Sequence, residues 1–278
     1  MRIALHQMTS RVLPATNVLD MVGGIETAAD GGAVMYFAPE MSIMVNRKRD
    51  EARLQISNEA QTDSIDRLAQ VASRHNIWVH LGSIPVLHED GEHLANRTII
   101  ISADGAVVAR YDKIHLFDVD LKSGESWRES SAYVGGEGPV IAHTPLGKMG
   151  LAICYDMRFP DLFSAYAKAD VDMITLPSAF TVPTGTAHWH TLLRARAIES
   201  ECFVIAAAQC GLHEDGRETY GHSLVVDPWG EVILDMGSAP GLGFVDLNLD
   251  KIAEVRQQIP VHQNRREIAA PRFYPSKD

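Results

Sequence analysis

Short apolar runs typical of strands recur along most of this sequence, and they limit the possible folds more than any other feature. The runs at 33–37, 149–153 and 172–177 are almost free of charge, as expected for strands that are buried on both faces. Each run is short and is followed by turn residues or by a longer segment in which polar and apolar residues are mixed. This arrangement favours strands that alternate with helices.

Apolar residues recur at helical spacing in segments between these runs. The clearer set is Ile65, Leu68, Val71 and Ala72. In an earlier segment the set is Leu19, Val22 and Ile25, preceded by Asn17 as the expected N-cap. Helices and strands in this order predict a layered α/β protein.

Two turn sequences predict antiparallel hairpins within this α/β pattern. Asp104-Gly105, a dipeptide suited to positive φ, separates the strand-like segments 96–102 and 106–111. Pro228-Trp229-Gly230 lies between two further apolar segments. Hairpins together with βα units predict mixed β-sheets. A doubly wound nucleotide-binding fold is not expected, because no G-x-G-x-x-G follows the first strand and no P-loop sequence occurs.

The domain organisation is expected to be simple. No Pro/Gly/Ser-rich linker or internal repeat divides the sequence, so residues 1–278 are predicted to form a single domain, with a C-terminal tail from about residue 259. The net charge of −11 and the lack of a basic stripe argue against a nucleic-acid partner. No window approaches the roughly 18 apolar residues of a membrane helix, so no membrane partner is expected.

The cysteines predict the compartment. Cys154, Cys202 and Cys210 form no C-x-x-C pair and no even set, which indicates free thiols in a reducing environment. The first residues lack the apolar core of a signal peptide. A cytoplasmic location is therefore expected, with Cys202 and Cys210 as inert residues of an apolar strand.

Three reactive residue types follow directly after predicted strands. They are Glu40, Lys113 and Cys154. Each alone has an ordinary explanation as a surface charge or a small buried side chain. Together they have the composition of a thiol-dependent amide hydrolase: a thiol with a pKa near ~8.5 needs a base or a cation to become a nucleophile. Glu40 would be the base, and Lys113 with the backbone N–H of Tyr155 would stabilise the oxyanion.

Longer sequence matches surround these candidates. Residues 38–41 are Ala-Pro-Glu-Met, residues 111–118 are Tyr-Asp-Lys-Ile-His-Leu-Phe-Asp, and residues 153–160 are Ile-Cys-Tyr-Asp-Met-Arg-Phe-Pro. In this order they resemble the three motifs of the nitrilase, or carbon–nitrogen hydrolase, superfamily. Further matches extend the resemblance over essentially the whole chain: 185–190, 193–199, 220–223 and 226–231.

The resemblance implies an αββα four-layer sandwich, pairing into a homodimer or higher homo-oligomer through a helical face, and no cofactor. It also implies a Glu40–Lys113–Cys154 triad with Glu129 as a second glutamate that orients Lys113 and the substrate amide. Glu125 and Glu137 compete with Glu129 for this role but lack the flanking match. The sequence departs from the family pattern at Ala38, where Leu is common, and in the loop 122–127.

Within the superfamily, residues 177–180 and 206–211 resemble the deaminated glutathione amidase branch most, with omega-amidases acting on 2-oxoglutaramate as the alternative. The predicted reaction is hydrolysis of a linear amide C–N bond in a small carboxylated substrate through a cysteine thioester. Arg158 either binds the substrate carboxylate or forms an ion pair with Asp156. Phe117 and Phe180, with Tyr155, are candidates for lining the substrate pocket.

Two other functions remain as alternatives. A metal-dependent hydrolase would need histidine ligands, but His188 and His190 point apart on a helix, and His115 and His222 have no partner at ligand spacing, so no metal site is expected. A catalytically idle binding subunit is the other alternative, although the intact set of catalytic residue types argues against it.

Overall fold

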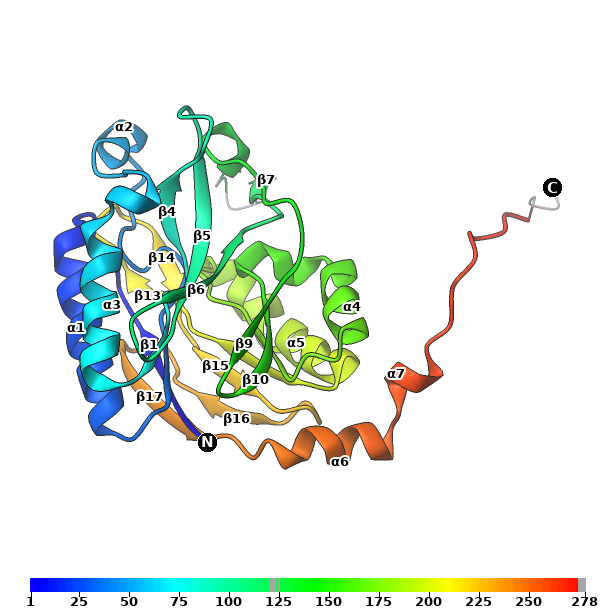
Figure 1. The fold of residues 1–278 in the computed structure, drawn as a ribbon. Helices are drawn as coiled ribbons and strands as arrows, with labels where there is room; N and C mark the ends of the chain where they lie inside the picture. Colours follow the sequence, from blue (N-terminus) through cyan, green and yellow to red (C-terminus); the bar gives the residue numbers. More distant parts are fainter. Residues whose placement is uncertain (121–123, 125, 275–278) are drawn as a thin grey trace.

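Two β-sheets lie face to face, and helices cover the outer face of each (Figure 1). The computed structural model describes residues 1–120, 124 and 126–274. One apolar core fills the space between the sheets and continues beneath the helices of the second sheet, and another lies between the first sheet and its helices. The first strand borders both cores, because successive side chains of a strand point to opposite faces. Ile3 and Leu5 belong to the core between the sheets, and Ala4 belongs to the core under the helices of the first sheet.

The first sheet has seven strands in the order β17-β1-β2-β3-β5-β4, with β6 paired to β5. It is mixed, because β1 is parallel to β2 and antiparallel to β17. Its strands are β1 (Arg2–Gln7), β2 (Met35–Phe37), β3 (Trp78–His80), β4 (Ile84–Leu87), β5 (Leu94–Ile101), β6 (Val107–Asp112) and β17 (Gly241–Asp246). Its outer helices are α1 (Pro14–Asp30) and α3 (Asp63–His75).

The second sheet has six strands in the order β16-β15-β12-β11-β10-β9 and is also mixed. Its strands are β9 (Val140–Thr144), β10 (Gly147–Leu151), β11 (Met173–Thr175), β12 (Phe203–Ala206), β15 (Leu224–Val226) and β16 (Val232–Asp235). Its outer helices are α4 (Pro160–Lys168) and α5 (Val182–Ser200). The predicted αββα sandwich with mixed sheets is therefore confirmed.

Shorter elements form the rim of the sandwich and the C-terminal part of the chain. Two small hairpins are β7 (Asp118–Asp120) with β8 (Ser126–Arg128), and β13 (Cys210–Leu212) with β14 (Glu218–Tyr220). The short helical turns are α2 (Arg49–Arg53), η1 (Glu59–Gln61), η2 (Glu129–Ser131) and η3 (Cys154–Arg158). After α6 (Asp250–Gln258) and α7 (Val261–Asn264), the chain extends away from the sandwich (Figure 1).

The structure tests the local predictions. In α3 the buried residues are Ile65, Leu68, Val71 and Ala72, as the spacing predicts. The predicted start of the first helix is wrong: α1 begins at Pro14, and Asn17 is buried inside it, where its side-chain amide bonds to the backbone of Arg11 and Ile43. Leu19 consequently faces solvent, because α1 buries a neighbouring stripe of residues instead: Val18, Met21, Ile25 and Ala28.

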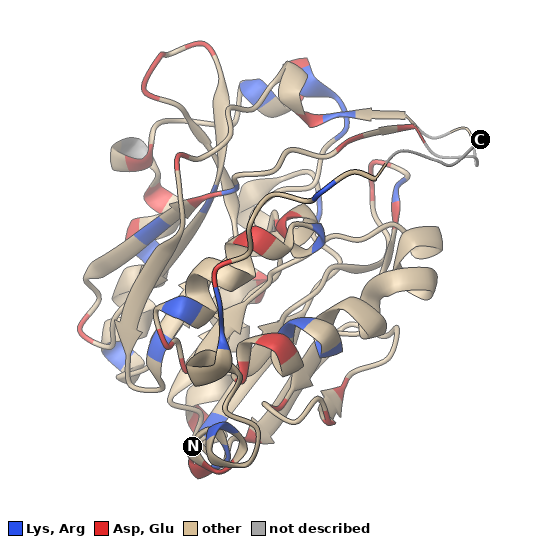
Figure 2. Ribbon diagram, turned by 90° about the vertical axis from the view of Figure 1, so that its right-hand side faces the viewer, with Lys and Arg blue, Asp and Glu red and all other residues tan. Residues whose placement is uncertain are grey.

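Two further observations concern the charged residues and the length of the helices. Acidic and basic residues are interspersed along the ribbon in the view of Figure 2. No helix in the described part of the chain combines the length and the apolar character needed to cross a bilayer. Of the atypical loop 122–127, residues 122, 123 and 125 lie outside the described residues.

Candidate active site

Glu40, Lys113 and Cys154 meet where strands of the two sheets end. Glu40 follows β2, Lys113 directly follows β6, and Cys154 begins the turn η3 just after β10. All three are buried, with exposed fractions of 4%, 2% and 8%. Cys154 has a φ of 47°, in the left-handed region that non-glycine residues rarely adopt, and such strain is common at functional positions.

The Lys113 ammonium is held between two carboxylates. Its Nζ donates to Glu40 Oε1 at 3.0 Å and to Glu129 Oε2 at 2.9 Å. Burial alone would lower the pKa of Lys113, but attraction by Glu129, Glu40 and Cys154 outweighs it and raises the pKa well above its ordinary value. Lys113 is therefore a permanent cation in the site.

Asn96 on β5 completes this network, and sequence reasoning missed it. Its Nδ2 donates to Glu40 Oε1 at 3.0 Å and to Glu129 Oε1 at 3.3 Å. The backbone supplies two more donors, from Ala179 to Glu40 Oε2 at 2.9 Å and from Phe117 to Glu129 Oε2 at 2.7 Å. Both carboxylates are thus fixed in position by several donors each, as a pre-organised site requires.

The Cys154 thiol lies against the Glu40 carboxylate. Both residues line the same cavity as Lys113, and the charges of Glu40 and Lys113 are close enough to act on the thiol. Burial raises the pKa of Cys154 well above its ordinary value, the negative charge of Glu40 adds to the increase, and the positive charge of Lys113 opposes it. The resting group at Cys154 is therefore a neutral thiol rather than a preformed thiolate.

A buried carboxylate holds the turn η3 in place. Asp156 Oδ2 accepts from the Tyr111 hydroxyl at 2.7 Å and from the Ile153 N–H at 2.9 Å, and Oδ1 accepts from the backbone N–H of His115 at 3.0 Å. The expected alternative of an Arg158–Asp156 ion pair is wrong. Arg158 Nη1 instead lies 3.3 Å from His188 Nδ1.

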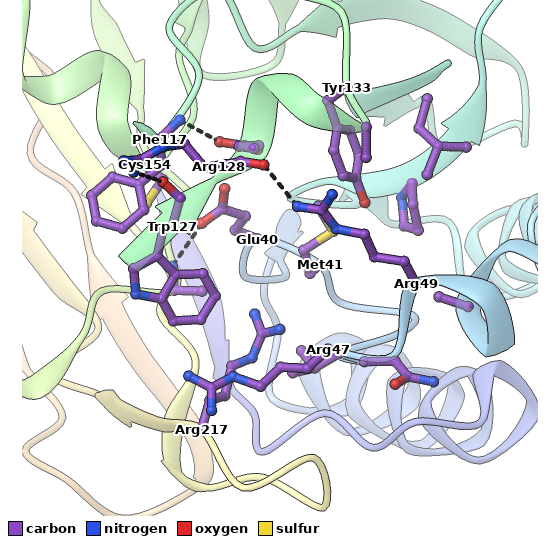
Figure 3. Close-up of a pocket in the computed structure, with 18 of the residues that line it drawn as sticks. Glu40, Met41, Arg47, Arg49, Phe117, Trp127, Arg128, Tyr133, Cys154 and Arg217 are labelled. Atoms are coloured by element: carbon purple, nitrogen blue, oxygen red, sulfur yellow. Dashed lines mark hydrogen bonds between the residues drawn. The ribbon is translucent and has the colours of Figure 1, made fainter. Parts of the chain in front are cut away.

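These groups open into a cavity of about 800 Å³ (Figure 3). Four residues predicted to contact the substrate line it: Phe117, Tyr155, Arg158 and Phe180. The Phe117 and Tyr155 rings meet edge to face with centroids 5.1 Å apart, and the Arg158 guanidinium lies 5.5 Å from the centre of the Phe180 ring. This cavity is near the upper end of the roughly 300–1,000 Å³ range of small-molecule sites.

Of the two glutamates that compete with Glu129, the structure describes only Glu137. Glu137 is exposed and does not line the cavity, whereas Glu129 does. Glu125 lies outside the described residues. Of the loop 122–127, Ser126 and Trp127 line the cavity, so this loop contributes to its wall.

Two of the histidines meet a carboxylate outside the cavity. The expectation that His222 has no partner at ligand spacing is wrong, because His222 and His190 both contact Asp235, at 2.9 and 3.0 Å. These three residues could hold a metal ion, but none of them lines the cavity. Spacing along the chain could not reveal the group, since its members come from α5, from the loop after β14 and from β16.

Comparison with known proteins decides the family. The sequence profile described as "Carbon-nitrogen hydrolase" matches residues 2–257. The chain belongs to the carbon-nitrogen hydrolase family. Among curated carbon-nitrogen hydrolases, it is 41% identical over 270 residues to the deaminated glutathione amidase of Bos taurus, covering 95% of this chain and 81% of that protein. It is 37% identical to the deaminated glutathione amidase of Synechocystis, covering 94% and 97%.

Solved structures of carbon-nitrogen hydrolases share the fold. The C. elegans NitFhit protein superimposes with a TM-score of 0.88 at 37% identity, over 95% of this chain and 65% of that one. Saccharomyces cerevisiae Nit3 superimposes with a TM-score of 0.86 at 28% identity, over 96% and 97%. This chain is accordingly an amidohydrolase, an enzyme that hydrolyses carbon–nitrogen bonds in amides.

Proposed function

We propose that this carbon-nitrogen hydrolase cleaves the amide bond of a small carboxylated substrate through a thioester on Cys154. The observation that carries the proposal is the convergence of Cys154 and Glu40 on one cavity, beside an ammonium that Glu40 and Glu129 hold in place. A thiol, a base and a fixed cation facing one cavity are the components of nucleophilic acyl transfer. A catalytically idle binding subunit would have no use for this arrangement.

In the first half of the reaction, Glu40 takes the proton of Cys154 as the sulfur attacks the amide carbon. The carbonyl oxygen becomes an oxyanion, which the Lys113 ammonium and the Tyr155 N–H stabilise. Glu40 then gives its proton to the departing nitrogen, so the C–N bond breaks and an acyl-thioester remains on Cys154.

In the second half, Glu40 accepts a proton from a water molecule that attacks the thioester carbon, and the acid product leaves as the thiol is restored. Glu129 acts through Lys113, which it contacts with both oxygens at 3.2 and 2.9 Å. It fixes the ammonium at the oxyanion position. Neither half requires a metal or an organic cofactor.

The proposed substrate is deaminated glutathione. The relatives that carry this name support it, because they match almost the whole chain at about 40% identity. Arg158 lies at the cavity wall, where a guanidinium can bind the carboxylate of a 2-oxoglutaryl group. Phe117, Phe180 and Tyr155 would enclose the rest of that group. The alternative is an omega-amidase activity on 2-oxoglutaramate, which presents the same acyl group.

For the assembly, we propose one domain over residues 1–278, with the tail from about residue 259, pairing into a cytoplasmic homodimer through the face of α4 and α5. Ile198 on α5 and Trp229 are about half exposed, and they lie on the same face, because Gly230 directly contacts Ile198. Free thiols at all three cysteines suit a reducing compartment. The molar mass from light scattering, with and without Ile198→Asp, tests the pairing.

The decisive test of the function is turnover of deaminated glutathione and 2-oxoglutaramate by wild-type protein and by Cys154→Ala. We expect a higher kcat/KM for deaminated glutathione, no turnover by the variant, and an acyl adduct on the Cys154 peptide in mass spectra of rapidly quenched wild-type protein. Turnover by Cys154→Ala would disprove the covalent mechanism. A preference for 2-oxoglutaramate would favour the omega-amidase alternative.

A further inference from the structure

Two arginines and a tryptophan form a second polar region of the cavity wall, distinct from the catalytic groups. Trp127 is on β8, Arg47 lies in the loop between β2 and α2, and Arg217 lies in the loop of the β13–β14 hairpin. The guanidinium carbons lie 4.9 Å (Arg47) and 5.1 Å (Arg217) from the centre of the Trp127 ring. Figure 3 shows both side chains extending toward Trp127 along one side of the cavity. We call Arg47 and Arg217 the arginine pair.

The positive charge of the arginine pair is only partly balanced by the protein. Arg217 donates through Nε to Asp215 at 2.9 Å, and this is the one carboxylate within 4.0 Å of either guanidinium in the described part of the chain. Glu218 and Asp50 also line the cavity but come no closer than that limit. Burial lowers the pKa of Arg217, Asp215 opposes the decrease, and the charge of Arg47 adds to it. An anion placed between the two guanidiniums would relieve this repulsion.

The position of the arginine pair relative to the nucleophile suits a substrate longer than a simple monoamide. The Trp127 ring lies 6.3 Å from the Phe117 ring, which in turn lies 5.1 Å from the ring of Tyr155, the residue next to Cys154. Arg158 is at a different place, against Phe180 and His188. The arginine pair and Arg158 are therefore two separate cationic positions on the cavity wall, which Arg49, Arg53 and Arg128 also line.

The two candidate substrates differ in the number of anionic groups that these positions could bind. Deaminated glutathione is an amide of 2-oxoglutarate whose nitrogen belongs to a cysteinylglycine dipeptide, so it has one carboxylate on the acyl side and one at the end of the leaving amine. A dipeptide extends roughly 7 Å. In 2-oxoglutaramate the leaving group is ammonia, and only the acyl carboxylate is present.

We propose that the arginine pair binds the terminal carboxylate of a peptide-like leaving amine, while Arg158 binds the acyl side. The inference rests on the proposed function and deepens it. It assigns the preference between the two substrates to Arg47 and Arg217, which lie on the rim loops of the cavity rather than among the catalytic residues. Stacking on Trp127 keeps both guanidiniums in place when no substrate is bound.

The test compares Arg47→Gln and Arg217→Gln with wild-type protein on three substrates: deaminated glutathione, its C-terminal glycinamide and 2-oxoglutaramate. We expect each variant to lower kcat/KM for deaminated glutathione by roughly 10- to 100-fold, mainly through KM. The values for the glycinamide and for 2-oxoglutaramate should change by less than about 3-fold. Because Arg217→Gln leaves Asp215 without its partner and can reduce stability, Arg47→Gln is the primary variant.

A matched control removes a charge from the same loop without touching the cavity. Lys48 neighbours Arg47, pairs with Glu51 at 2.9 Å and does not line the cavity, so Lys48→Gln should behave as wild type on all three substrates. Equal losses on deaminated glutathione and its glycinamide in Arg47→Gln, or no loss on either, would overturn the inference while leaving the proposed function intact.

A binding measurement separates this inference from the proposed function. By calorimetry, Cys154→Ala should bind deaminated glutathione more tightly than the glycinamide, and adding Arg47→Gln should remove the difference. If wild-type protein hydrolyses neither substrate but this difference is found, the proposed function fails and the carboxylate site stands. If wild-type protein hydrolyses deaminated glutathione but the difference is absent, the carboxylate site fails alone.

Discussion

Replacing Glu129 by glutamine should cost most of the activity with little change in the fold. Each oxygen of the carboxylate accepts from two N–H donors. Oε1 accepts from Asn96 at 3.3 Å and Lys113 at 3.2 Å, and Oε2 accepts from Phe117 at 2.7 Å and Lys113 at 2.9 Å. In Glu129→Gln, one of these positions becomes an NH2 group. Whichever orientation the amide takes, the NH2 group faces two donors, one of them the ammonium.

The cost can be estimated from these contacts. The substitution loses a charge-assisted hydrogen bond to Lys113 and leaves a second donor without an acceptor, which together cost about 3 kcal/mol. Because Lys113 is then held less firmly at the oxyanion position, the loss should appear in the transition state and lower kcat by roughly 10²-fold. KM should change little. Lys113 keeps its 3.0 Å contact with Glu40, so the protein should remain folded.

The assay is steady-state hydrolysis of deaminated glutathione, with circular-dichroism melting of the same samples to verify the fold. Glu137→Gln is the matched control, since Glu137 is an exposed carboxylate that does not line the cavity, and its kcat should equal that of wild type. A folded Glu129→Gln protein with kcat within about 3-fold of wild type would refute the assigned role.

Four further predictions follow from the same contacts. Cys154→Ala should abolish turnover, whereas exhaustive chelation should leave the kcat of wild-type protein unchanged; activity lost to chelation and restored by a metal would contradict this. Lys113→Ala should lower kcat by at least roughly 10²-fold, and should lower the free energy of unfolding by about 3–5 kcal/mol, because two buried carboxylates lose their cation. Asn96→Ala should lower kcat by a smaller factor, on the order of 10-fold. Burial lowers the pKa of His80 to about 3, so its ring is neutral in the native state but binds a proton near pH 6.5 once the protein unfolds. The free energy of unfolding should therefore fall as the pH decreases below about 6.5. In melting curves, the stability of His80→Asn should depend less on pH than that of wild type.

The sequence alone determined those features that depend on local pattern. The spacing of Ile65 and Leu68 selected the buried face of α3, and Asp104-Gly105 placed the β5–β6 hairpin, because each depends only on neighbouring residues. The motifs around Glu40, Lys113 and Cys154 identified the superfamily, because they resemble its three motifs in the same order. The same local reasoning failed for Asn17, whose buried amide bonds to a distant backbone segment.

Tertiary structure decided how these residues are completed into a site. In the sequence, nothing distinguishes Asn96 from an ordinary strand residue. In the structure, β5 brings its amide to Glu40, just after β2, and to Glu129, so Asn96 donates to both carboxylates. The contact of Arg158 with His188 and the approach of Arg47 and Arg217 to Trp127 likewise join segments far apart in the chain. Such contacts depend on which strands pair and where their ends meet. Sequence periodicity carries no information about that, because it describes which face of an element is buried and not which element covers it.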